Sequence, residues 1–383
     1  MSVEGVLQAQ RLVTGHDDID AVDGWVEVRD GIVVAIGEGA TPSGSPVTRV
    51  AGTIIPGFVD IHAHGAVGFD FSRADAQGVR AAAAHHASTG TTTLVASVAS
   101  GTTEATEGAI DRLRDLVSDG TLAGIHLEGP YLSHARRGAH NPDVLRSPDL
   151  AELSGFIDLA RGTLRCVTIA PELPGAEAAI RILAGRGVVA AIGHTDCSAE
   201  IAHAAFGWGA THATHLYNGM PELLHRAPGP VGATLVDRDA TVELILDGIH
   251  LAPEAVQVAV RSAAGRIVLV SDAMEATGQP DGDYAIAGSD VVVRDGIAML
   301  ADGSSLAGST RVIADCFGTL LAFDGVSLAD AVRATSVTPA RAMRLPFAGL
   351  EVGSPADLLV VDTAPEFTVR RVLRRGEWLA SSS

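Results

Sequence analysis

Short apolar runs alternate along the middle of the chain with alanine-rich segments that are compatible with helices. Strands that are apolar on both faces indicate a parallel sheet, because helices cover both of its sides. About eight such strand–helix units predict an α/β fold, a (β/α)8 barrel of the TIM type. The predicted strands are residues 54–64, 91–97, 122–129, 165–172, 188–195, 210–218, 242–250 and 267–274, and the predicted helices include residues 74–88, 104–117, 176–185, 199–207 and 253–264.

Both ends of the chain carry a different pattern, in which apolar and polar residues alternate between turn signals. Residues 24–37 predict a β-hairpin that turns at Asp30-Gly31. Residues 356–362 and 367–379 carry similar runs, with a turn at Arg375-Gly376. Ends of matching character predict one small β-sandwich domain made from residues 1–53 and 346–383, with the barrel in residues 54–345.

The charge of the chain limits its partners. It has 27 basic and 46 acidic residues, which give a formal net charge of −19. Nucleic acids and anionic membrane surfaces need a positive footprint, so we expect neither as a partner, and an anionic substrate must meet a local basic pocket. The sequence opens without a signal-like segment and contains no apolar run long enough to cross a bilayer, so we expect a cytoplasmic protein.

The chain contains no lysine, so all of its basic residues are arginines. This excludes Schiff-base chemistry, the Walker P-loop and metal bridges made by a carbamylated lysine. The cysteines Cys166, Cys197 and Cys316 are odd in number and far apart, which argues against a disulfide framework or a cysteine zinc site. Each is expected to be a small buried hydrophobic residue.

Polar residues gather where the predicted strands end. In a barrel of this type, the carboxyl ends of the strands converge on one mouth, where active sites lie. So many polar residues at the same end of successive strands indicate a functional site rather than chance. They are His62, His64, Glu128, Glu172, His194, His215, Asn218, Asp247, His250 and Asp272.

Five of these residues are the candidate metal ligands. His62 and His64 are two positions apart, so an extended strand turns both imidazoles to the same side. With Glu128, His194 and His215 they supply more ligands than one tetrahedral ion needs if a position stays open for water or substrate. The set predicts one or two divalent ions, zinc or iron, and Glu128 is placed to bridge a pair.

Asp272 ends the last predicted strand, where a carboxylate could take a proton from a metal-activated water. The alternative is a capping role at a strand-to-helix turn. His126 and His212 each stand near a proposed ligand, and their roles stay open between support of the ligands and packing.

A basic patch for a phosphate is predicted from Arg226, His140 and the pair Arg136-Arg137. Arg226 is the firmer member of this patch. The pair alone is equally compatible with a solvated loop, because charged loop residues usually face water.

Several motifs together resemble the amidohydrolase superfamily and, within it, the N-acetylglucosamine-6-phosphate deacetylases. The superfamily motifs are Pro56-Gly-Phe-Val-Asp-Ile-His-Ala-His-Gly65, Gly193-His-Thr-Asp196, Val270-Ser-Asp-Ala273 and Gly353-Ser-Pro-Ala-Asp-Leu-Leu-Val-Val-Asp362. The motifs similar to the deacetylases are His126-Leu-Glu-Gly-Pro-Tyr131, Gly138-Ala-His-Asn-Pro142, Ala213-Thr-His-Leu-Tyr-Asn-Gly-Met220, Asp247-Gly-Ile-His250 and Leu306-Ala-Gly-Ser309. The resemblance runs almost from end to end of the chain.

The resemblance implies a role for each matching residue. Glu128, His194 and His215 would hold the main metal, His62 and His64 would allow a second one, and Asp272 would be the general acid and base. The implied reaction is hydrolytic deacetylation of N-acetylglucosamine 6-phosphate in amino-sugar metabolism, by a homodimer in which the segment of Arg226 reaches the neighbouring subunit's site. The implied contacts to the sugar phosphate are Ala139, His140, Asn218, Gly219, Arg226, Asp247, His250, Leu306, Ala307 and Gly308.

Three alternatives stay open at this point. One is a deacetylase of N-acetylgalactosamine 6-phosphate, and another is a different glutamate-bridged amidohydrolase. The third is a noncatalytic scaffold that kept the barrel, which the complete set of metal-type residues disfavours. Gly219 stands where many members of the family have alanine, which loosens the local backbone.

Overall fold

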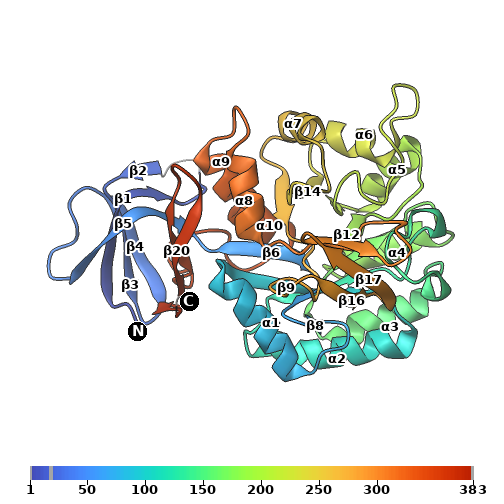
Figure 1. Ribbon diagram of the computed structural model, residues 1–383, viewed down its shortest axis with the longest axis horizontal. Coiled ribbons are helices and arrows are strands. Elements are labelled where there is room, and N and C mark those ends of the chain that lie inside the picture. Colours follow the sequence, from blue (N-terminus) through green and yellow to red (C-terminus); the bar gives the residue numbers. More distant parts are fainter. Residues whose placement is uncertain (1, 17–19, 381–383) are drawn as a thin grey trace.

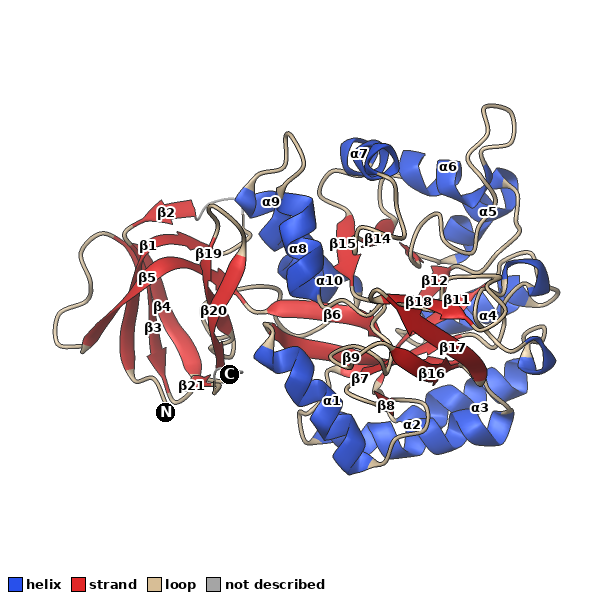
Figure 2. Ribbon diagram, viewed as in Figure 1, coloured by secondary structure: helices blue, strands red, loops and turns tan. Residues whose placement is uncertain are grey.

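The central body of the molecule is a parallel β-barrel, seen on the right in Figures 1 and 2, in a computed structural model that describes residues 2–16 and 20–380. Its eight strands follow one another in chain order around the sheet and are all parallel. They are β6 (Phe58–Ala63), β9 (Thr91–Ala99), β10 (Gly124–Glu128), β11 (Leu164–Ile169), β12 (Val189–Ile192), β13 (His212–Ala213), β14 (Thr241–Ile245) and β15 (Ile267–Val270).

The barrel is nearly closed between its first and last strands. The amide of Asp272, just beyond β15, donates to the carbonyl of His62 in β6 over 2.9 Å. One residue earlier, the hydroxyl of Ser271 donates to the carboxylate of the fully buried Asp60. These contacts fix the mouth of the barrel where the first and last strands meet.

Helices surround the barrel, as the alternation of the sequence predicts. Several begin with a side-chain cap; for example, Asp75 accepts from the amide of Gly78 at 2.8 Å and Asp149 accepts from the amide of Ala151 at 2.8 Å. The helices are α1 (Ala76–Ser88), α2 (Thr103–Ser118), α3 (Leu150–Ala160), α4 (Ala176–Gly185), α5 (Ala199–Trp208), α6 (Gly229–Val236), α7 (Pro253–Ser262), α8 (Ile313–Leu321), α9 (Leu328–Val332) and α10 (Thr338–Ala342), with a π-helical segment, Arg333–Val337, between the last two and 3-10 turns at His134–Arg136 and Pro142–Val144.

The side chains of each barrel strand divide between two environments. In β10, Ile125 and Leu127 pack in the main core under the helices, whereas His126 and Glu128 point to the other side. A second apolar cluster, which includes Ile245 of β14 and Ala340 of α10, fills another part of the barrel strands. The barrel therefore carries an apolar layer and, toward its mouth, a layer of buried polar side chains.

The chain ends together form a separate sheet, on the left in Figure 1. Its strand order is β21-β20-β19-β5-β1-β3-β4, with β2 beside β1, and strands from both halves of the order share one apolar core. It is one sheet folded over on itself rather than two separate sheets. The strands are β1 (Gly5–Val13), β2 (Asp20–Val22), β3 (Gly24–Arg29), β4 (Ile32–Glu38), β5 (Val47–Pro56), β19 (Leu358–Asp362), β20 (Thr368–Arg374) and β21 (Glu377–Trp378).

Two smaller sheets lie near the mouth of the barrel. One is the short pair β7 (Gly65–Ala66) and β8 (Phe69–Asp70). The other is an antiparallel three-stranded sheet, β16 (Gly282–Ile286), β17 (Ser289–Arg294) and β18 (Ile297–Leu300). The sequence pattern did not predict this second sheet.

The predicted fold class is confirmed, including a separate β structure made by both chain ends. The eight predicted strands and five predicted helices all form, but the predicted strand at residues 210–218 was too long, because only His212–Ala213 are extended and the residues after them turn into the site. The division at residues 53/54 and 345/346 stays a prediction.

The three cysteines are buried and free, as expected. Within the described residues, no helix combines the length and the apolar character that a membrane span requires.

Candidate metal centre and active site

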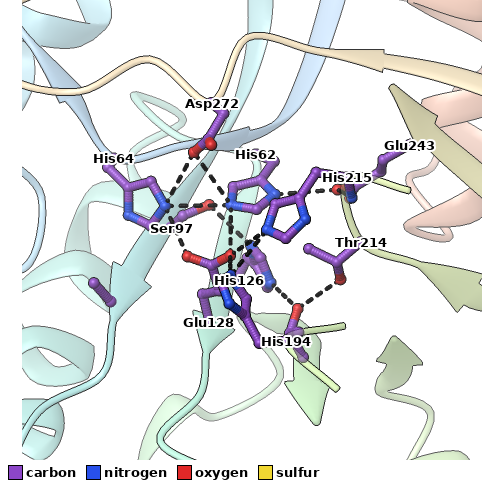
Figure 3. A network of polar contacts seen from close by, with 12 residues as sticks. His62, His64, Ser97, His126, Glu128, His194, Thr214, His215, Glu243 and Asp272 are labelled. Atoms are coloured by element: carbon purple, nitrogen blue, oxygen red, sulfur yellow. Dashed lines mark hydrogen bonds and ion pairs between the residues drawn. The ribbon is translucent and has the colours of Figure 1, made fainter. Parts of the chain in front are cut away.

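The carboxylate of Glu128 lies at the centre of the site (Figure 3). Glu128 is the last residue of β10 and is buried. Its Oε1 is 2.9 Å from Nε2 of His215, 3.1 Å from Nε2 of His194 and 3.4 Å from Nε2 of His62. Its Oε2 is 3.0 Å from Nε2 of His64. The five residues that the sequence predicts as metal ligands therefore meet around one carboxylate.

These residues and Asp272 fall into two groups of possible ligands, and within each group the ligand atoms lie within 4.8 Å of one another. The HxH cluster contains His62, His64 and Asp272, and the Glu128 cluster contains Glu128, His194 and His215. Asp272 Oδ1 is 3.4 Å from Nε2 of His64 and 3.6 Å from Nε2 of His62. Since Glu128 contacts imidazoles of both clusters, it is placed between them.

The chemistry of this donor set fits a divalent metal. Nε2 of His62 and Nε2 of His64 are 3.2 Å apart, and Nε2 of His194 and Nε2 of His215 are 3.0 Å apart. Two imidazole lone pairs that face each other at this separation repel unless a proton or a cation lies between them. Neutral imidazole and carboxylate suit zinc or iron, so the residues present fit one or two such ions.

Three site residues leave their strands in a left-handed backbone conformation. The φ angles of His194, His215 and Asp272 are 46°, 27° and 47°. Residues other than glycine seldom adopt such angles, and where they do the surrounding structure holds them. For Asp272, the carbonyl accepts the amide of Ser309 at 2.8 Å while its own amide is bound to β6. The direction of its carboxylate is therefore fixed from two sides.

Glu243 is a buried site residue that the sequence analysis missed. It lies in β14, in the run Thr241–Ile245, and is 1% exposed. Its carboxylate contacts Nδ1 of His62 at 3.1 Å, Nε2 of His212 at 2.7 Å and the amide of His215 at 3.0 Å. The available signal was a single charge inside an otherwise apolar strand, which is costly to bury without partners.

His126 lies beneath His62, and both of its ring nitrogens form hydrogen bonds with hydroxyl groups. Its Nδ1 is 2.9 Å from Oγ of Ser97 and its Nε2 is 2.8 Å from Oγ1 of Thr168. The two rings meet edge to face, with centroids 4.7 Å apart. Burial lowers the pKa of His126 well below its ordinary value, so the ring is neutral. His126 therefore supports His62 by packing and is not placed as a ligand.

The charges of the site shift the pKa values of its members. Burial acts to raise the pKa of Glu128, but His62 and His140 outweigh it and hold that pKa well below its ordinary value. Burial acts to lower the pKa of His62, but Glu128, Glu243 and Asp272 raise it well above its ordinary value. The site thus concentrates negative charge on buried oxygens, which is the electrostatic environment that a cation requires.

A cavity of about 180 Å³ opens onto both clusters. Its floor includes His64, Glu128 and Asp272, and one wall comes from the region of the three-stranded sheet, with Ile286 of β16 and Leu306. The complete lining is His64, Ala99, Glu128, Gly138, Ala139, His140, His194, His215, Asn218, Gly219, Ile245, His250, Asp272, Ile286, Ala287, Ser305, Leu306 and Gly308.

Most of the predicted sugar-phosphate contacts lie in this lining. They are Ala139, His140, Asn218, Gly219, His250, Leu306 and Gly308. His140 is buried, its Nε2 lies 3.2 Å from Glu128 Oε2, and burial lowers its pKa to about 4. It is therefore neutral near pH 7. Its Nδ1 accepts from the amide of Ser100 at 3.3 Å, so its one N–H group is on Nε2, beside Glu128 at the cavity.

Three of the predicted contacts lie outside the lining: Arg226, Asp247 and Ala307. Asp247 lies behind His250, with Oδ2 at 2.7 Å from Nδ1 of that residue, so it orients the ring that faces the cavity. Ala307 is fully buried in a small apolar cluster next to Leu306.

The predicted basic patch does not assemble in the cavity of a single chain. Arg226 is exposed in the loop between Leu224 and Ala227. Arg136 pairs with Asp196 at 2.8 Å, and Arg137 donates to the carbonyl of His140 at 3.3 Å. No arginine belongs to the cavity lining in the described part of the chain.

The structure explains why position 219 is glycine in this chain, where many members of the family have alanine. Its φ is +60°, and a Cβ there would lie 2.9 Å from Nδ1 of His194. That nitrogen contacts the carbonyl of Arg136 at 2.8 Å. A side chain at position 219 would therefore press on the hydrogen bond that orients His194.

Comparison with known proteins gives a consistent result. Residues 53–379 match the model of the Amidohydrolase family. N-acetylgalactosamine-6-phosphate deacetylase of Escherichia coli O157:H7 is 35% identical over 365 residues, which cover 94% of this chain and 95% of that protein. N-acetylglucosamine-6-phosphate deacetylase of Vibrio furnissii is 33% identical over 329 residues, 84% of this chain and 82% of that protein.

Two solved structures of N-acetyl-D-glucosamine-6-phosphate deacetylase from Mycobacterium smegmatis have the same fold. The first has a TM-score of 0.94 and 41% identity and covers 98% of this chain and 100% of its own. The second, a mutant in complex with N-acetyl-D-glucosamine-6-phosphate, has a TM-score of 0.94 and 41% identity and covers 98% of both chains. Each similarity extends over most of the molecule.

Proposed function

Because the chain belongs to the amidohydrolase family, we propose that it hydrolyses the acetamide group of N-acetyl-D-glucosamine 6-phosphate in amino-sugar metabolism. The products are acetate and D-glucosamine 6-phosphate. The chain is an enzyme, a hydrolase that acts on an amide, as its relatives are. The observation that carries the proposal is the pair of ligand clusters at the mouth of the barrel, with Asp272 beside the cavity.

Members of this superfamily are metal-dependent, and we propose zinc or iron for this chain. Glu128, His194 and His215 would hold the main ion, and His62 and His64 would hold a second one. The metal supplies Lewis acidity, which promotes ionisation of a water molecule and polarises the amide carbonyl.

In the proposed mechanism, Asp272 moves the proton. Its carboxylate accepts a proton as the water oxygen attacks the acetyl carbon, and it returns that proton to the nitrogen as the carbon–nitrogen bond breaks. The free amine and acetate then leave. The neutral imidazole of His140 donates to the oxygen of the tetrahedral intermediate, where negative charge develops. Burial at the base of the cavity strengthens both interactions, because less water screens them.

The sugar phosphate is held by the upper wall of the cavity. His250, oriented by Asp247, and the segment of Asn218 and Gly219 face the space where the phosphate would lie. Since no arginine of the described chain lines the cavity, we propose that Arg226 reaches the site of a second subunit in a homodimer. The cytoplasmic location also stays a prediction.

A galacto substrate is the second candidate, because the Escherichia coli O157:H7 relative at 35% identity is named for N-acetylgalactosamine 6-phosphate. The two sugars differ in the configuration of one hydroxyl group. The glucosamine substrate is favoured by the Mycobacterium smegmatis structures, whose identity to the chain is 41%.

Acetate release by the metal-supplemented protein tests the proposal. The panel is N-acetylglucosamine 6-phosphate, its galactosamine epimer and unphosphorylated N-acetylglucosamine. We expect the first to be turned over with the highest kcat/KM and the unphosphorylated sugar to be a poor substrate. Preference for the epimer would establish the second candidate, and absence of turnover on all three would reject both.

Replacement of Asp272 by asparagine tests the mechanism. Asp272→Asn keeps the shape of the side chain but cannot accept the proton, so we expect kcat to fall by about 10²- to 10⁴-fold. Metal content is measured in the same preparation, because Asp272 also belongs to the HxH cluster. Full turnover by Asp272→Asn with intact metal content would contradict the assigned role.

A further inference from the structure

The buried carboxylate of Glu243 is shared between the two ligand clusters. Its Oε2 accepts from Nδ1 of His62, in the HxH cluster, and from the backbone amide of His215, in the Glu128 cluster, at 3.1 Å and 3.0 Å. Its Oε1 lies 2.7 Å from Nε2 of His212. Both oxygens are therefore engaged, and Glu243 itself is not a residue of the cavity lining.

The hydrogen-bond chemistry of this arrangement determines where the protons of His62 and His212 lie. An ionised carboxylate only accepts hydrogen bonds. The backbone amide of His215 can only donate, so Oε2 of Glu243 is an acceptor toward it, and the two imidazole nitrogens lie within hydrogen-bond distance of the same carboxylate. It follows that Nδ1 of His62 and Nε2 of His212 both carry hydrogen.

With hydrogen on Nδ1, the lone pair of His62 is on Nε2, which faces the centre of the site. A metal-binding imidazole is neutral and has one N–H group, so a proton on Nδ1 leaves a lone pair on Nε2. Nε2 of His62 is the atom that faces His64 at 3.2 Å, Glu128 at 3.4 Å and Asp272 at 3.6 Å. The opposite tautomer would point an N–H group at those ligands.

The other ligand imidazoles are oriented differently. Nδ1 of His194 contacts a backbone carbonyl, that of Arg136, at 2.8 Å. Nδ1 of His64 and Nδ1 of His215 are buried and have no hydrogen-bond partner among the described residues. His62 is thus the only one of the four whose outer nitrogen meets a carboxylate within the described chain.

We propose that Glu243, oriented by His212, is a positioning residue that fixes the metal-binding tautomer of His62 and ties it to the backbone of His215. The HxH cluster depends on Glu243 through a side-chain contact, whereas the Glu128 cluster is reached only through a backbone amide. Loss of the carboxylate therefore weakens metal binding at the HxH cluster more than at the Glu128 cluster.

The test compares Glu243→Gln with Glu243→Asp. Glutamine has nearly the same shape but offers an N–H₂ group in place of one oxygen, so one of its neighbours must change tautomer or lose its bond. Aspartate keeps the acceptor chemistry on a shorter side chain and serves as the conservative variant if the glutamine variant folds poorly. Glu27→Gln is the matched control, because Glu27 is also a buried strand glutamate but lies in β3 of the chain-end sheet.

The first readout is the tautomer of His62 in the metal-free protein, from long-range ¹H–¹⁵N spectra of histidine-labelled samples at alkaline pH, where the ring is neutral and carries one N–H group. The second is calorimetric titration with zinc alone, together with zinc content after dialysis. We expect wild type and Glu27→Gln to show His62 with hydrogen on Nδ1. For Glu243→Gln we expect a changed tautomer and a 10- to 100-fold weaker affinity at the HxH cluster, with partial recovery in Glu243→Asp.

An unchanged tautomer and wild-type zinc affinity at the HxH cluster in Glu243→Gln would overturn the inference. Equal weakening of both clusters, with no recovery in Glu243→Asp, would also overturn it, because that result indicates a general loss of structure. The inference rests on the proposed metal centre, but the experiment can reject the metal centre and the role of Glu243 independently of each other. If wild type bound no zinc, the metal proposal would fail, while the tautomer in metal-free protein would still decide the role of Glu243.

Discussion

Gly308 is a residue of the cavity lining whose backbone leaves little room for a side chain. Its φ is +69°, and a Cβ there would lie 2.9 Å from the carbonyl oxygen of Asp272. We expect Gly308→Ala to displace Asp272 and lower kcat at least about tenfold, since displacement of a catalytic group by about 1 Å can cost up to 10²-fold. Steady-state kinetics on the preferred substrate measure the effect.

Gly303 provides the matched control in the same loop. Its φ is +73°, but no heavy atom lies within 4 Å of the position of a Cβ. Alanine at either position should cost about 1 kcal/mol of stability because of the left-handed backbone, but Gly303→Ala should keep kcat within about twofold. Equal losses of kcat in both variants would show that backbone strain, rather than contact with Asp272, causes the effect.

The site residues differ in how far the sequence predicts them. His62, His64 and Glu128 stand in short motifs at strand ends, so their convergence follows from barrel geometry. Glu243 lies inside a strand, and its partners are 28 to 181 positions away along the chain, so its role depends on contacts that no local pattern encodes. Arg226 is the opposite case, because its residue type indicates phosphate but the fold of one chain leaves it exposed.

At the scale of elements, α1 is attached to the mouth of the barrel through a buried histidine. His86 lies on the inner face of α1, is fully buried, and contacts the carbonyl of Gly65 through Nε2 at 3.0 Å. Burial lowers its pKa from 6.5 to about 4. The unfolded chain therefore takes up this proton at a higher pH than the folded chain does.

The stability of the fold should consequently decrease as the pH falls below about 6.5, the ordinary pKa of histidine. Above that pH the contribution of neutral His86 is complete, and between pH 6.5 and about 4 it is progressively lost. We expect the wild type to lose about 2 kcal/mol more than His86→Gln between pH 7 and pH 5, in denaturant titrations of metal-free protein.

His203→Gln is the control for this comparison, because His203 lies exposed in α5. It should follow the pH dependence of the wild type. A variant His86→Gln that loses as much stability as the wild type over this range would show that another group controls the acid sensitivity.

The elements also show why sequence predicts part of the fold and misses the rest. Buried parallel strands and alanine-rich helices have clear periods, and all eight strands were found. The predicted strand around β13 was too long, because residues 214–218 form a turn that contacts β12 and β14 through the amides of Thr214 and Leu216. β16 to β18 were missed, since an antiparallel insertion interrupts the alternation of strands and helices that the prediction relied on.

At the scale of the whole molecule, metal binding and folding should be linked. The clusters hold a buried carboxylate among imidazoles whose lone pairs face one another, an arrangement that a cation relieves. A ligand at 1,000 times its dissociation constant stabilises the folded state by about 4 kcal/mol, so we expect chelation to lower the Tm by several degrees. Differential scanning calorimetry with and without a chelator measures the shift.

Glu128→Gln should remove this response to the chelator, because Glu128 contacts both clusters. A wild-type Tm that stays constant although elemental analysis shows that the metal has left would contradict the linkage. It would also indicate that the imidazoles find other partners in the metal-free protein.

The proposed dimer can be tested through Arg226. Asp272→Asn and Arg226→Ala should each be poorly active alone, but a mixed dimer would contain one site with an intact Asp272 and an Arg226 from the other chain. Random pairing of equal amounts makes half of the dimers mixed, so we expect about a quarter of wild-type activity after co-expression. No recovery, in mixtures shown to contain mixed dimers, would place Arg226 in the site of its own chain or in neither.

The polar layer inside the barrel has a consequence for tolerance to mutation. His126, His212, Thr168 and Glu243 are as deeply buried as the ligands, and most of their neighbours are polar as well. Replacement of any one of them leaves a buried polar partner without its hydrogen bond. Selection therefore acts on these residues as a set. In a saturation scan, these positions should tolerate as few amino acids as His194 or Asp272. Intolerance to change in this barrel therefore identifies the architecture of the site as well as the atoms that meet the substrate.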